Sequence, residues 1–288
     1  MPPLLRLGAA QYAFSPLADT KAFEHKLSSW VNQGVSQGAR LLLFPEYAAL
    51  DLVSTLGEFA ADDLAGQFQA LQPLLPWYLE CFAQQAAQHD ITIVAGSFPV
   101  QEADGYRNRA FVFSQNGLIG FQDKLLLTRF ERETGLMAPG TAQTPFDHAG
   151  IPFGICICYD AEFPLVTRAL ANAGAQLILV PSCTDAATGY HRVRIACQAR
   201  ALENQCYVVQ SPTVGNAPWC DAIDTNYGYA GVFTPPDIGF PADGVIAEGQ
   251  LYAEQWLITE LDLDKVARVR SEGQVQNYLD WDRQKDFE

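Results

Sequence analysis

Three reactive side chains come directly after apolar segments that are typical of β-strands. Cys158 ends the apolar run 151–158, Lys124 follows the segment 117–121, and Glu46 follows the segment 41–45. Open α/β sheets place their reactive groups at the carboxyl ends of strands, so these three side chains can share one site. The pattern predicts a thiol, an ammonium group and a carboxylate that act together.

The chemistry open to this set is nucleophilic catalysis by a thiolate. A free cysteine has a pKa of about 8.5, so only a few per cent of the thiol is ionised near pH 7. Glu46 can take the proton of Cys158 as a general base, and Lys124 can stabilise the thiolate and a later oxyanion. The backbone N–H of Tyr159 is a natural second oxyanion donor. Taken singly, a structural cysteine, a solvated glutamate and a surface lysine are the ordinary interpretations, but their joint occurrence predicts catalysis.

The segments that carry these residues resemble the nitrilase superfamily of carbon–nitrogen hydrolases. The resemblance covers residues 10–262 and rests on the following stretches, in the order typical of the family: Phe44-Pro45-Glu46, Asp123-Lys124-Leu125, Ile157-Cys158-Tyr159-Asp160 with Phe163-Pro164, and 199–205. It implies an α/β fold, a four-layer α-β-β-α sandwich with two mixed sheets. It also implies that Glu46, Lys124 and Cys158 are the catalytic set, that no metal or organic cofactor is used, and that the chain forms a homodimer or a higher homo-oligomer.

A second glutamate often follows the lysine in this family, and Glu131 and Glu133 are the candidates. Glu131 is favoured by its spacing and by the neighbouring Arg132. A carboxylate held near Lys124 would orient the ammonium group and support its charge. Alternatively, both glutamates are solvated loop residues.

One position departs from the family pattern. Related chains often carry an arginine two residues after the aspartate that follows Cys-Tyr, whereas this chain has Glu162. A carboxylate there favours a neutral or cationic substrate, or it caps the helix that is expected to begin near Phe163.

The residue after the nucleophile bears on the reaction. Nitrile-cleaving relatives tend to have tryptophan there, and this chain has Tyr159. The sequence therefore favours hydrolysis of a small amide or N-carbamoyl compound to a carboxylate and ammonia or an amine, through a thioester on Cys158. The alternatives are a nitrilase, a Cys-His thiol hydrolase with His191 as the base, and a non-catalytic interaction domain. Candidate substrate-binding residues are Glu162, Cys183, Thr184 and Arg192, with Arg194 as a second possible carboxylate-binding cation.

Composition limits the class of protein. The chain has 288 residues and 49% hydrophobic residues, which is enough for one large globular domain, 1–288, with a C-terminal tail from about 263. A net charge of −15 argues against nucleic acid or an anionic membrane as a partner and leaves a small-molecule substrate. Neither a membrane-length apolar run nor a signal peptide is evident, so we expect a cytoplasmic protein. Seven cysteines without a Cys-x-x-Cys pair, and four scattered histidines, predict neither a disulfide framework nor a metal site.

The reactive residues must be positioned by alternating strands and helices. Strands are predicted at 4–11, 40–44, 92–98, 109–113, 153–158, 177–180, 207–210 and 251–261. Helices are predicted at 19–35, 67–88 with a break near Pro73 and Pro76, 165–173, 192–204 and 264–270. The Pro- and Gly-rich stretch 234–249 is expected to be a surface loop. Strand–helix alternation together with strand–turn–strand pairs predicts a mixed α/β architecture.

Overall fold

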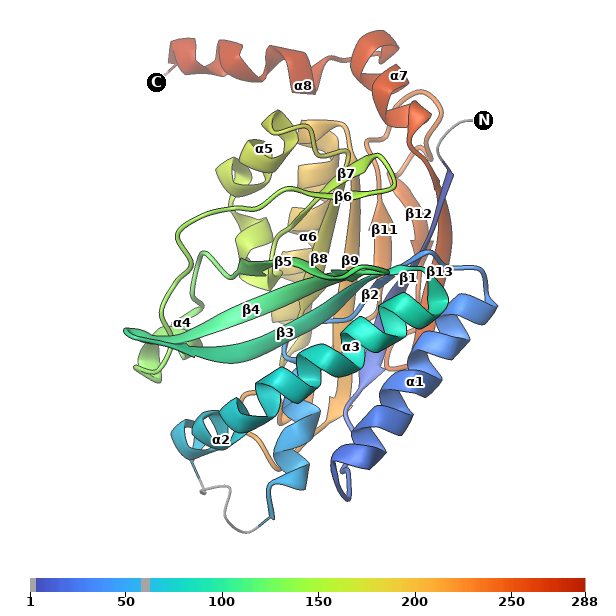
Figure 1. Cartoon of the computed structure of the whole chain (residues 1–288). Coiled ribbons are helices and arrows are strands. Elements are labelled where there is room, and N and C mark those ends of the chain that lie inside the picture. Colours follow the sequence, from blue (N-terminus) through green and yellow to red (C-terminus); the bar gives the residue numbers. More distant parts are fainter. Residues whose placement is uncertain (1–3, 58–62, 288) are drawn as a thin grey trace.

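The computed structural model describes residues 4–57 and 63–287. Its strands are β1 (Leu4–Ala13), β2 (Leu41–Leu43), β3 (Thr92–Glu102), β4 (Gly105–Ser114), β5 (Gly117–Asp123), β6 (Phe146–His148), β7 (Ile151–Ile155), β8 (Leu177–Ser182), β9 (Tyr207–Asn216), β10 (Thr225–Asn226), β11 (Gly231–Phe233), β12 (Val245–Glu248) and β13 (Gln255–Asp262). Its α-helices are α1 (Thr20–Ser36), α2 (Leu64–Leu71), α3 (Leu75–His89), α4 (Arg129–Glu133), α5 (Pro164–Asn172), α6 (Ala187–Asn204), α7 (Asp264–Glu272) and α8 (Asn277–Asp280). The 3₁₀ segments are η1 (Ala48–Thr55), η3 (Gln72–Leu74), η4 (Cys158–Glu162) and η5 (Trp281–Phe287). Figure 1 shows how these elements are arranged.

The described strands are hydrogen-bonded in the order β5-β4-β3-β2-β1-β9-β8-β7-β6, with β10 to β13 added at the side of this path. The pairs β1–β2, β2–β3, β7–β8 and β8–β9 are parallel, and β3–β4 and β4–β5 are antiparallel. The two halves join where Tyr12 and Ala13 of β1 pair with Thr213 and Val214 of β9. The predicted α/β class with mixed strand directions is confirmed. The finer prediction of two separate sheets in a four-layer sandwich stays a prediction, because hydrogen bonds connect the described strands into one set.

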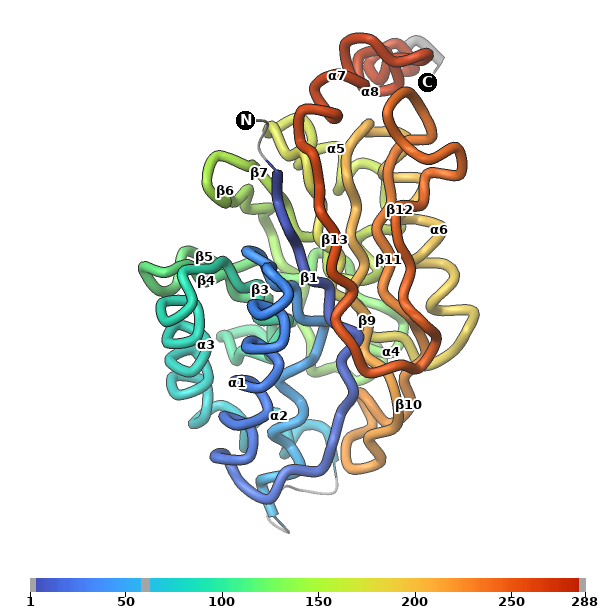
Figure 2. Tube along the Cα trace, turned by 90° about the vertical axis from the view of Figure 1, so that its right-hand side faces the viewer, coloured from blue at the N-terminus to red at the C-terminus, as the bar shows by residue number. Residues whose placement is uncertain are grey.

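Alternation along β2 explains how the sheet is covered. Leu41 and Leu43 belong to one hydrophobic cluster, and Leu42 and Phe44 belong to another. The second cluster also contains the buried faces of α1 and α3, whereas the first includes residues of α5 and α6. A strand buried on both faces reads as a continuous apolar run, which is why 41–44 shows no polar residue. Figure 2 shows α1 to α3 on one side of the strands and α6 on the other.

Several boundaries differ from the predictions. Asp19 caps the first turn of α1, since its side chain accepts a hydrogen bond from the Ala22 N–H at 2.8 Å. The predicted break in 67–88 is confirmed, because η3 separates α2 from α3. In contrast, α6 begins at Ala187 and not at 192. Gly189 weakens the helical pattern there, but the fully buried Tyr190 anchors the first turn.

One loop prediction and one predicted strand end were wrong. The expected loop 234–249 contains β12, whose short Val-Ile-Ala-Glu run pairs with β11. The flanking Pro and Gly residues hid this signal, because they are typical of loops. The strand predicted at 153–158 begins at Ile151 and ends at Ile155, so Cys158 is not a strand residue. Cys158 instead opens the 3₁₀ segment η4.

The C-terminal segment after β13 is helical and is held by polar side chains. Arg270 donates to the Asn204 carbonyl at 3.0 Å and to the Ala175 carbonyl at 3.2 Å. The Gln205 amide donates to the carbonyls of Val269 and Val275. These contacts tie α7 and the turn after it to the end of α6 (Figure 1). Within the described residues, none of the helices is long and apolar enough to cross a membrane.

Candidate active site

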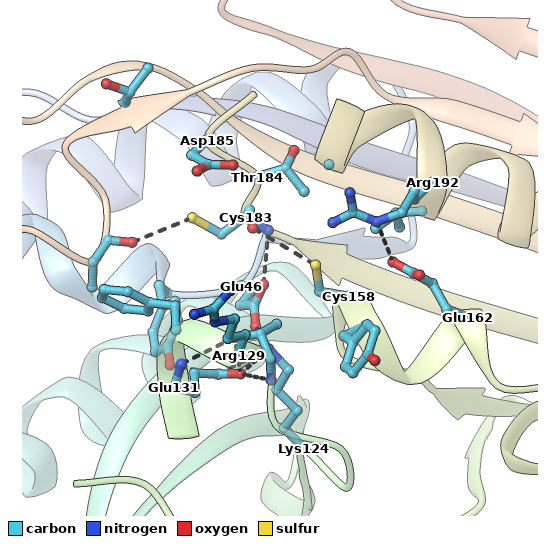
Figure 3. A pocket seen from close by; sticks show the side chains of 18 of the residues that line it. Glu46, Lys124, Arg129, Glu131, Cys158, Glu162, Cys183, Thr184, Asp185 and Arg192 are labelled. Carbon is cyan, nitrogen blue, oxygen red and sulfur yellow. Dashed lines mark hydrogen bonds and ion pairs between the residues drawn. The ribbon is translucent and has the colours of Figure 1, made fainter. Parts of the chain in front are cut away.

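Nine of the side chains predicted from the sequence as site residues line one cavity of about 320 Å³. These residues are Glu46, Lys124, Glu131, Cys158, Tyr159, Glu162, Cys183, Thr184 and Arg192. They come from the segments that follow β2, β5 and β8, from α4 and η4, and from the N-terminal half of α6. Figure 3 shows Glu46 between Lys124 and the loop of Cys183, with Cys158 beside it.

Lys124 is the buried cation of the site. It follows β5 directly, and its side chain is 2% exposed. Its Nζ lies 2.8 Å from Oε1 of Glu46 and 2.8 Å from Oε2 of Glu131. Burial by itself would lower the pKa of Lys124, but the two carboxylates outweigh burial and raise that pKa above its ordinary value. The ammonium group therefore keeps its charge at neutral pH.

Glu131, and not Glu133, is the carboxylate that contacts Lys124. Glu131 is the N3 residue of a capping box, in which the N–H and hydroxyl of Thr128 donate to its Oε2 at 2.8 and 2.9 Å. Burial acts to raise the pKa of Glu131, but Lys124 and these hydrogen bonds overcome it and lower the pKa to about 2. Glu133 instead pairs with Arg129 on the surface, at 2.6 Å.

Glu46 is held from both of its oxygens. Its Oε1 accepts from Lys124 and, at 2.8 Å, from Nδ2 of Asn108, while its Oε2 accepts from the Cys183 N–H at 2.9 Å. Burial raises the pKa of Glu46, the Lys124 charge opposes that rise, and the nearby Glu131 charge adds to it. A carboxylate with a raised pKa holds an abstracted proton better than an ordinary one, as a general base requires.

Cys158 has an uncommon backbone conformation. Its φ of 49° lies in the left-handed region, which costs energy for a residue with a side chain. The thiol contacts the Cys183 carbonyl at 3.8 Å. Burial and the Glu46 charge raise the pKa of Cys158, while Lys124 lowers it less, so the resting side chain is a protonated thiol. Its activation therefore needs a base.

The loop that carries Glu46 is supported by a bulge in β3. The pairing register of β3 with β4 shifts between Val94 and Ser97, and Gly96 in this bulge has a φ of 74°. A Cβ on Gly96 would lie 2.2 Å from the Pro45 carbonyl oxygen. The next residue, Ser97, accepts a hydrogen bond on its Oγ from the Tyr47 N–H at 2.8 Å. The bulge thus contacts the backbone directly before Glu46, at the Pro45 carbonyl, and directly after it, at the Tyr47 N–H.

Two buried side chains of the site were missed from the sequence. Asn108 lies within β4 and donates to both Glu46 and Glu131. Tyr47 donates its hydroxyl to Oε1 of Glu131 at 2.9 Å. Asn108 lies one residue before the strand predicted at 109–113, so nothing in the sequence marked its side chain as buried; in the structure it is 1% exposed. Tyr47 follows Glu46 directly, but its partner lies 84 residues away, so its hydrogen bond could not be inferred locally.

The remaining predicted residues form the wall and rim of the cavity. Glu162 and Arg192 pair with each other at 3.6 Å, as Figure 3 shows. The Thr184 hydroxyl donates to the Tyr227 carbonyl, and the Tyr159 ring packs edge-on against Phe163. The sulfur of Cys183 points away from Cys158 (Figure 3). It lies 3.3 Å from Oδ1 of Asn226 and 3.9 Å from the Ala222 carbonyl oxygen.

Two other predicted alternatives have different surroundings. Arg194 is paired with Glu248, so it is occupied by a protein carboxylate. His191 is exposed, and its ring contacts Tyr190 and Tyr227. Across 4–57 and 63–287, no group of three or more His, Cys, Asp or Glu side chains could hold a metal ion.

A model of the carbon–nitrogen hydrolase family matches residues 6–271. The chain belongs to the carbon–nitrogen hydrolase family. This confirms the family of carbon–nitrogen hydrolases that the sequence motifs predicted. The probable hydrolase YhcX of Bacillus subtilis is 33% identical over 276 residues, which are 96% of this chain and 53% of that protein. The carbon–nitrogen hydrolase chain therefore spans about half of the length of this relative.

Two further similarities agree with the family assignment. The omega-amidase NIT2-B of Xenopus laevis is 24% identical, with 93% of this chain and 92% of that protein covered. The solved carbon–nitrogen hydrolase of Helicobacter pylori has a TM-score of 0.78 at 19% identity, covering 99% of this chain and 96% of that one. Saccharomyces cerevisiae Nit3 has a TM-score of 0.72 at 21% identity, covering 93% of each chain. At these identities, the two structures show the fold of the carbon–nitrogen hydrolase.

Proposed function

We propose that the chain hydrolyses a small amide or N-carbamoyl compound to a carboxylate and ammonia or an amine, through a thioester on Cys158. The observation that carries this proposal is the shared buried cavity, where a protonated thiol lies with a carboxylate of raised pKa and a charged lysine. These are the three components that covalent catalysis by a thiol requires: nucleophile, base and oxyanion stabiliser.

In the acylation half of this scheme, Glu46 takes the proton of Cys158, and the sulfur forms a bond to the substrate carbonyl carbon. The carbonyl electron pair moves to oxygen, where Lys124 and the Tyr159 N–H stabilise it. The oxyanion collapses and the C–N bond breaks. The leaving nitrogen takes the proton from Glu46, which restores the carboxylate and leaves the thioester.

In the second half, water attacks the thioester. Glu46 takes a proton from that water, a second oxyanion forms at the same place, and the C–S bond breaks. The sulfur leaves as a thiolate and regains a proton from Glu46. Lys124 is charged throughout, and Glu131 with its Thr128 and Asn108 contacts holds it in place.

The amide preference rests on Tyr159 in the place of a tryptophan, and the relatives point the same way. NIT2-B is named an omega-amidase, and a solved Nesterenkonia structure with a TM-score of 0.67 is titled an amidase. A panel of small amides, N-carbamoyl compounds and nitriles, read by mass spectrometry, tests the choice. Turnover of nitriles alone would contradict it.

Replacing the nucleophile or the base gives the sharpest test. In Cys158→Ala, turnover should fall at least 1,000-fold, because the thioester cannot form. Cys156→Ala is the matched control, since Cys156 is a fully buried thiol two residues away whose contact is the Thr167 hydroxyl. Its turnover should stay within about threefold of the wild type. Persistent activity of Cys158→Ala would overturn the scheme.

Glu46→Gln keeps the size of the side chain but cannot accept a proton. We expect kcat to fall by about 100-fold to 10,000-fold, which is the usual contribution of a general base. An unchanged kcat would transfer the base role to another group, and the Cys-His alternative would then be tested with His191→Ala. The scheme predicts an active His191→Ala enzyme.

The proposal includes the assembly and location implied by the family resemblance. We expect a homodimer or higher homo-oligomer of four-layer sandwiches, in the cytoplasm, formed by one domain with the tail from about 263. Light scattering of the purified chain measures the mass in solution, and a monomer at micromolar concentration would contradict the assembly.

A further inference from the structure

A buried carboxylate that the proposed mechanism does not use lies behind the cavity. Asp160 is 1% exposed and is the third residue of η4, two residues after Cys158. It is absent from the residues that line the cavity, so it does not face a substrate directly. Its contacts are therefore the guide to what it does.

The Asp160 carboxylate accepts hydrogen bonds from the two loops that carry the nucleophile and the lysine. Its Oδ1 accepts from the N–H groups of Leu126 at 2.8 Å and Leu125 at 3.1 Å, immediately after Lys124. Its Oδ2 accepts from the Ile157 N–H at 3.2 Å, immediately before Cys158. One side chain thus fixes the backbone directly after Lys124 and directly before Cys158.

This arrangement matters most because Cys158 has a left-handed backbone. Without a Gly at that position, the turn keeps its conformation only if its surroundings hold it. The bond from Ile157 to Asp160 spans the strained residue and closes the first turn of η4. The hydrogen bonds from the N–H groups of Leu125 and Leu126 then fix the position of the Lys124 backbone relative to that turn.

We propose that Asp160 is a positioning residue that couples the Lys124 loop to the Cys158 turn and so sets the distance between ammonium group and nucleophile. This inference rests on the proposed function of Cys158 and Lys124. Asp160 acts through the backbone of its neighbours and touches no reacting atom. All of its partners are N–H donors, so the coupling needs the ionised carboxylate, which offers acceptors on both oxygens.

The charge of Asp160 is finely balanced. Burial raises its pKa to about 7, against the lowering effect of Lys124 and of the N–H groups of Leu126, Leu125 and Ile157. Two further ionisable side chains lie near it: Cys156 on the preceding segment, whose pKa the Asp160 charge helps to raise, and Arg200 on α6, which donates to the Ala161 carbonyl. Protonation near pH 7 would replace one acceptor with a donor and loosen one of the two loops.

The test compares Asp160→Asn with Asp51→Asn in the full-length chain. Asp51 is a matched control, because it is a fully buried carboxylate that also accepts several hydrogen bonds, from Tyr12, Ser15 and Lys26, away from the cavity. Both variants should melt at lower temperature. The readout is the rate of Cys158 alkylation by iodoacetamide between pH 5 and 9, followed by peptide mass spectrometry.

In Asp160→Asn, we expect alkylation of Cys158 to slow at least tenfold, and the part of the decline near pH 7 that exceeds the effect of thiol ionisation to disappear. With a substrate from the amide panel, kcat per folded enzyme should fall at least tenfold while KM stays within threefold. Asp51→Asn should match the wild type in the alkylation rate, in its pH dependence, and in kcat and KM. A wild-type rate and pH profile for Asp160→Asn, or equal slowing in Asp51→Asn, would overturn the proposal.

Hydrogen exchange on the wild type covers the case in which Asp160→Asn does not fold. After correction for intrinsic exchange rates, protection of the Leu125 and Leu126 amides should fall at the pH where alkylation slows. Constant protection across that range would overturn the coupling. These readouts concern the thiol and the backbone, so they are separate from the turnover of Cys158→Ala, which tests the proposed function itself.

Discussion

Two lysine–carboxylate networks in this molecule have similar components but differ in what surrounds them. One joins Lys124 to Glu46 and Glu131, and the other joins Lys26 to Asp51, with Tyr12 donating to Asp51. In both, a lysine contacts carboxylates at less than 3 Å, and a tyrosine hydroxyl donates to a carboxylate. Only the first opens on a cavity that contains a thiol.

The difference lies in how the lysine uses its three N–H groups. Lys26 donates to Asp51, to the Ala13 carbonyl and to the Ser15 hydroxyl. Among the described residues, Lys124 contacts only its two carboxylates, at three oxygens within 2.9 Å, and it lines the cavity. Of the two lysines, only Lys124 borders a space where a substrate oxyanion can lie, whereas the donors of Lys26 are shared among a carboxylate, a backbone carbonyl and a hydroxyl.

The largest expected contrast comes from removing each lysine. Lys124→Met should lower kcat at least 1,000-fold, since it removes oxyanion stabilisation and leaves two carboxylates side by side. Lys26→Met should leave kcat within about threefold but reduce the free energy of unfolding by about 3 kcal/mol, because it strands a buried charge. Steady-state kinetics and urea unfolding of both variants check this. Equal loss of kcat in the two would erase the distinction.

The contributions of Glu131 and Asp51 to the free energy of unfolding should depend on pH in opposite directions. The pKa of Glu131 is lowered to about 2, so its stabilising contribution is complete above about pH 4.5 and is lost as the pH falls toward 2. Burial raises the pKa of Asp51 despite Lys26, so its contribution is greatest below its ordinary value of 3.8 and is lost as the pH rises through the raised pKa.

Urea unfolding at pH 6 and pH 3 measures this contrast. Relative to the wild type, Glu131→Gln should lose less stability on acidification, and Asp51→Asn should lose more. Slopes of the same sign in the two variants would contradict the assigned charge states.

The smallest expected effect comes from the tyrosines. Tyr47→Phe removes the hydroxyl that donates to Glu131, so kcat should fall by about threefold to tenfold through a less fixed Lys124. Tyr12→Phe removes the equivalent hydroxyl at Asp51 and should cost about 1.5 kcal/mol of stability with kcat unchanged. A kinetic effect of Tyr12→Phe would show that the two networks are coupled.

The sequence predicted which residues meet in one cavity better than it predicted the elements around them. Glu46, Lys124 and Cys158 could be found because each lies at or after the end of an apolar segment. The approximate ends of a strand can be predicted from neighbouring residues alone. Glu131 was preferred over Glu133 on spacing, and the contact of Glu131 with Lys124 agrees with that choice. Their catalytic roles stay predictions.

What could not be predicted depends on long-range contacts. Asn108 reaches Glu46 across 62 positions, and the left-handed φ of Cys158 depends on the turn around it and has no signature in residue type. Asp160 was noticed as part of a motif, but its partners at Leu125 and Leu126 lie 35 and 34 residues away. The start of α6 was placed late because burial of Tyr190, and not helix propensity, decides it.

The bulge at Gly96 has a consequence for anyone who would transplant this chemistry. Three strand ends with a thiol, a carboxylate and a lysine are not a sufficient blueprint, because the Glu46 loop lies against a strand of a different sequence region. That strand, β3, must carry an extra residue at its bulge. The bulge residue must also be a glycine, because a Cβ at position 96 would lie 2.2 Å from the Pro45 carbonyl oxygen. A recipient scaffold with a regular, side-chain-bearing third strand would push the base away from the nucleophile, however well the three reactive residues were copied.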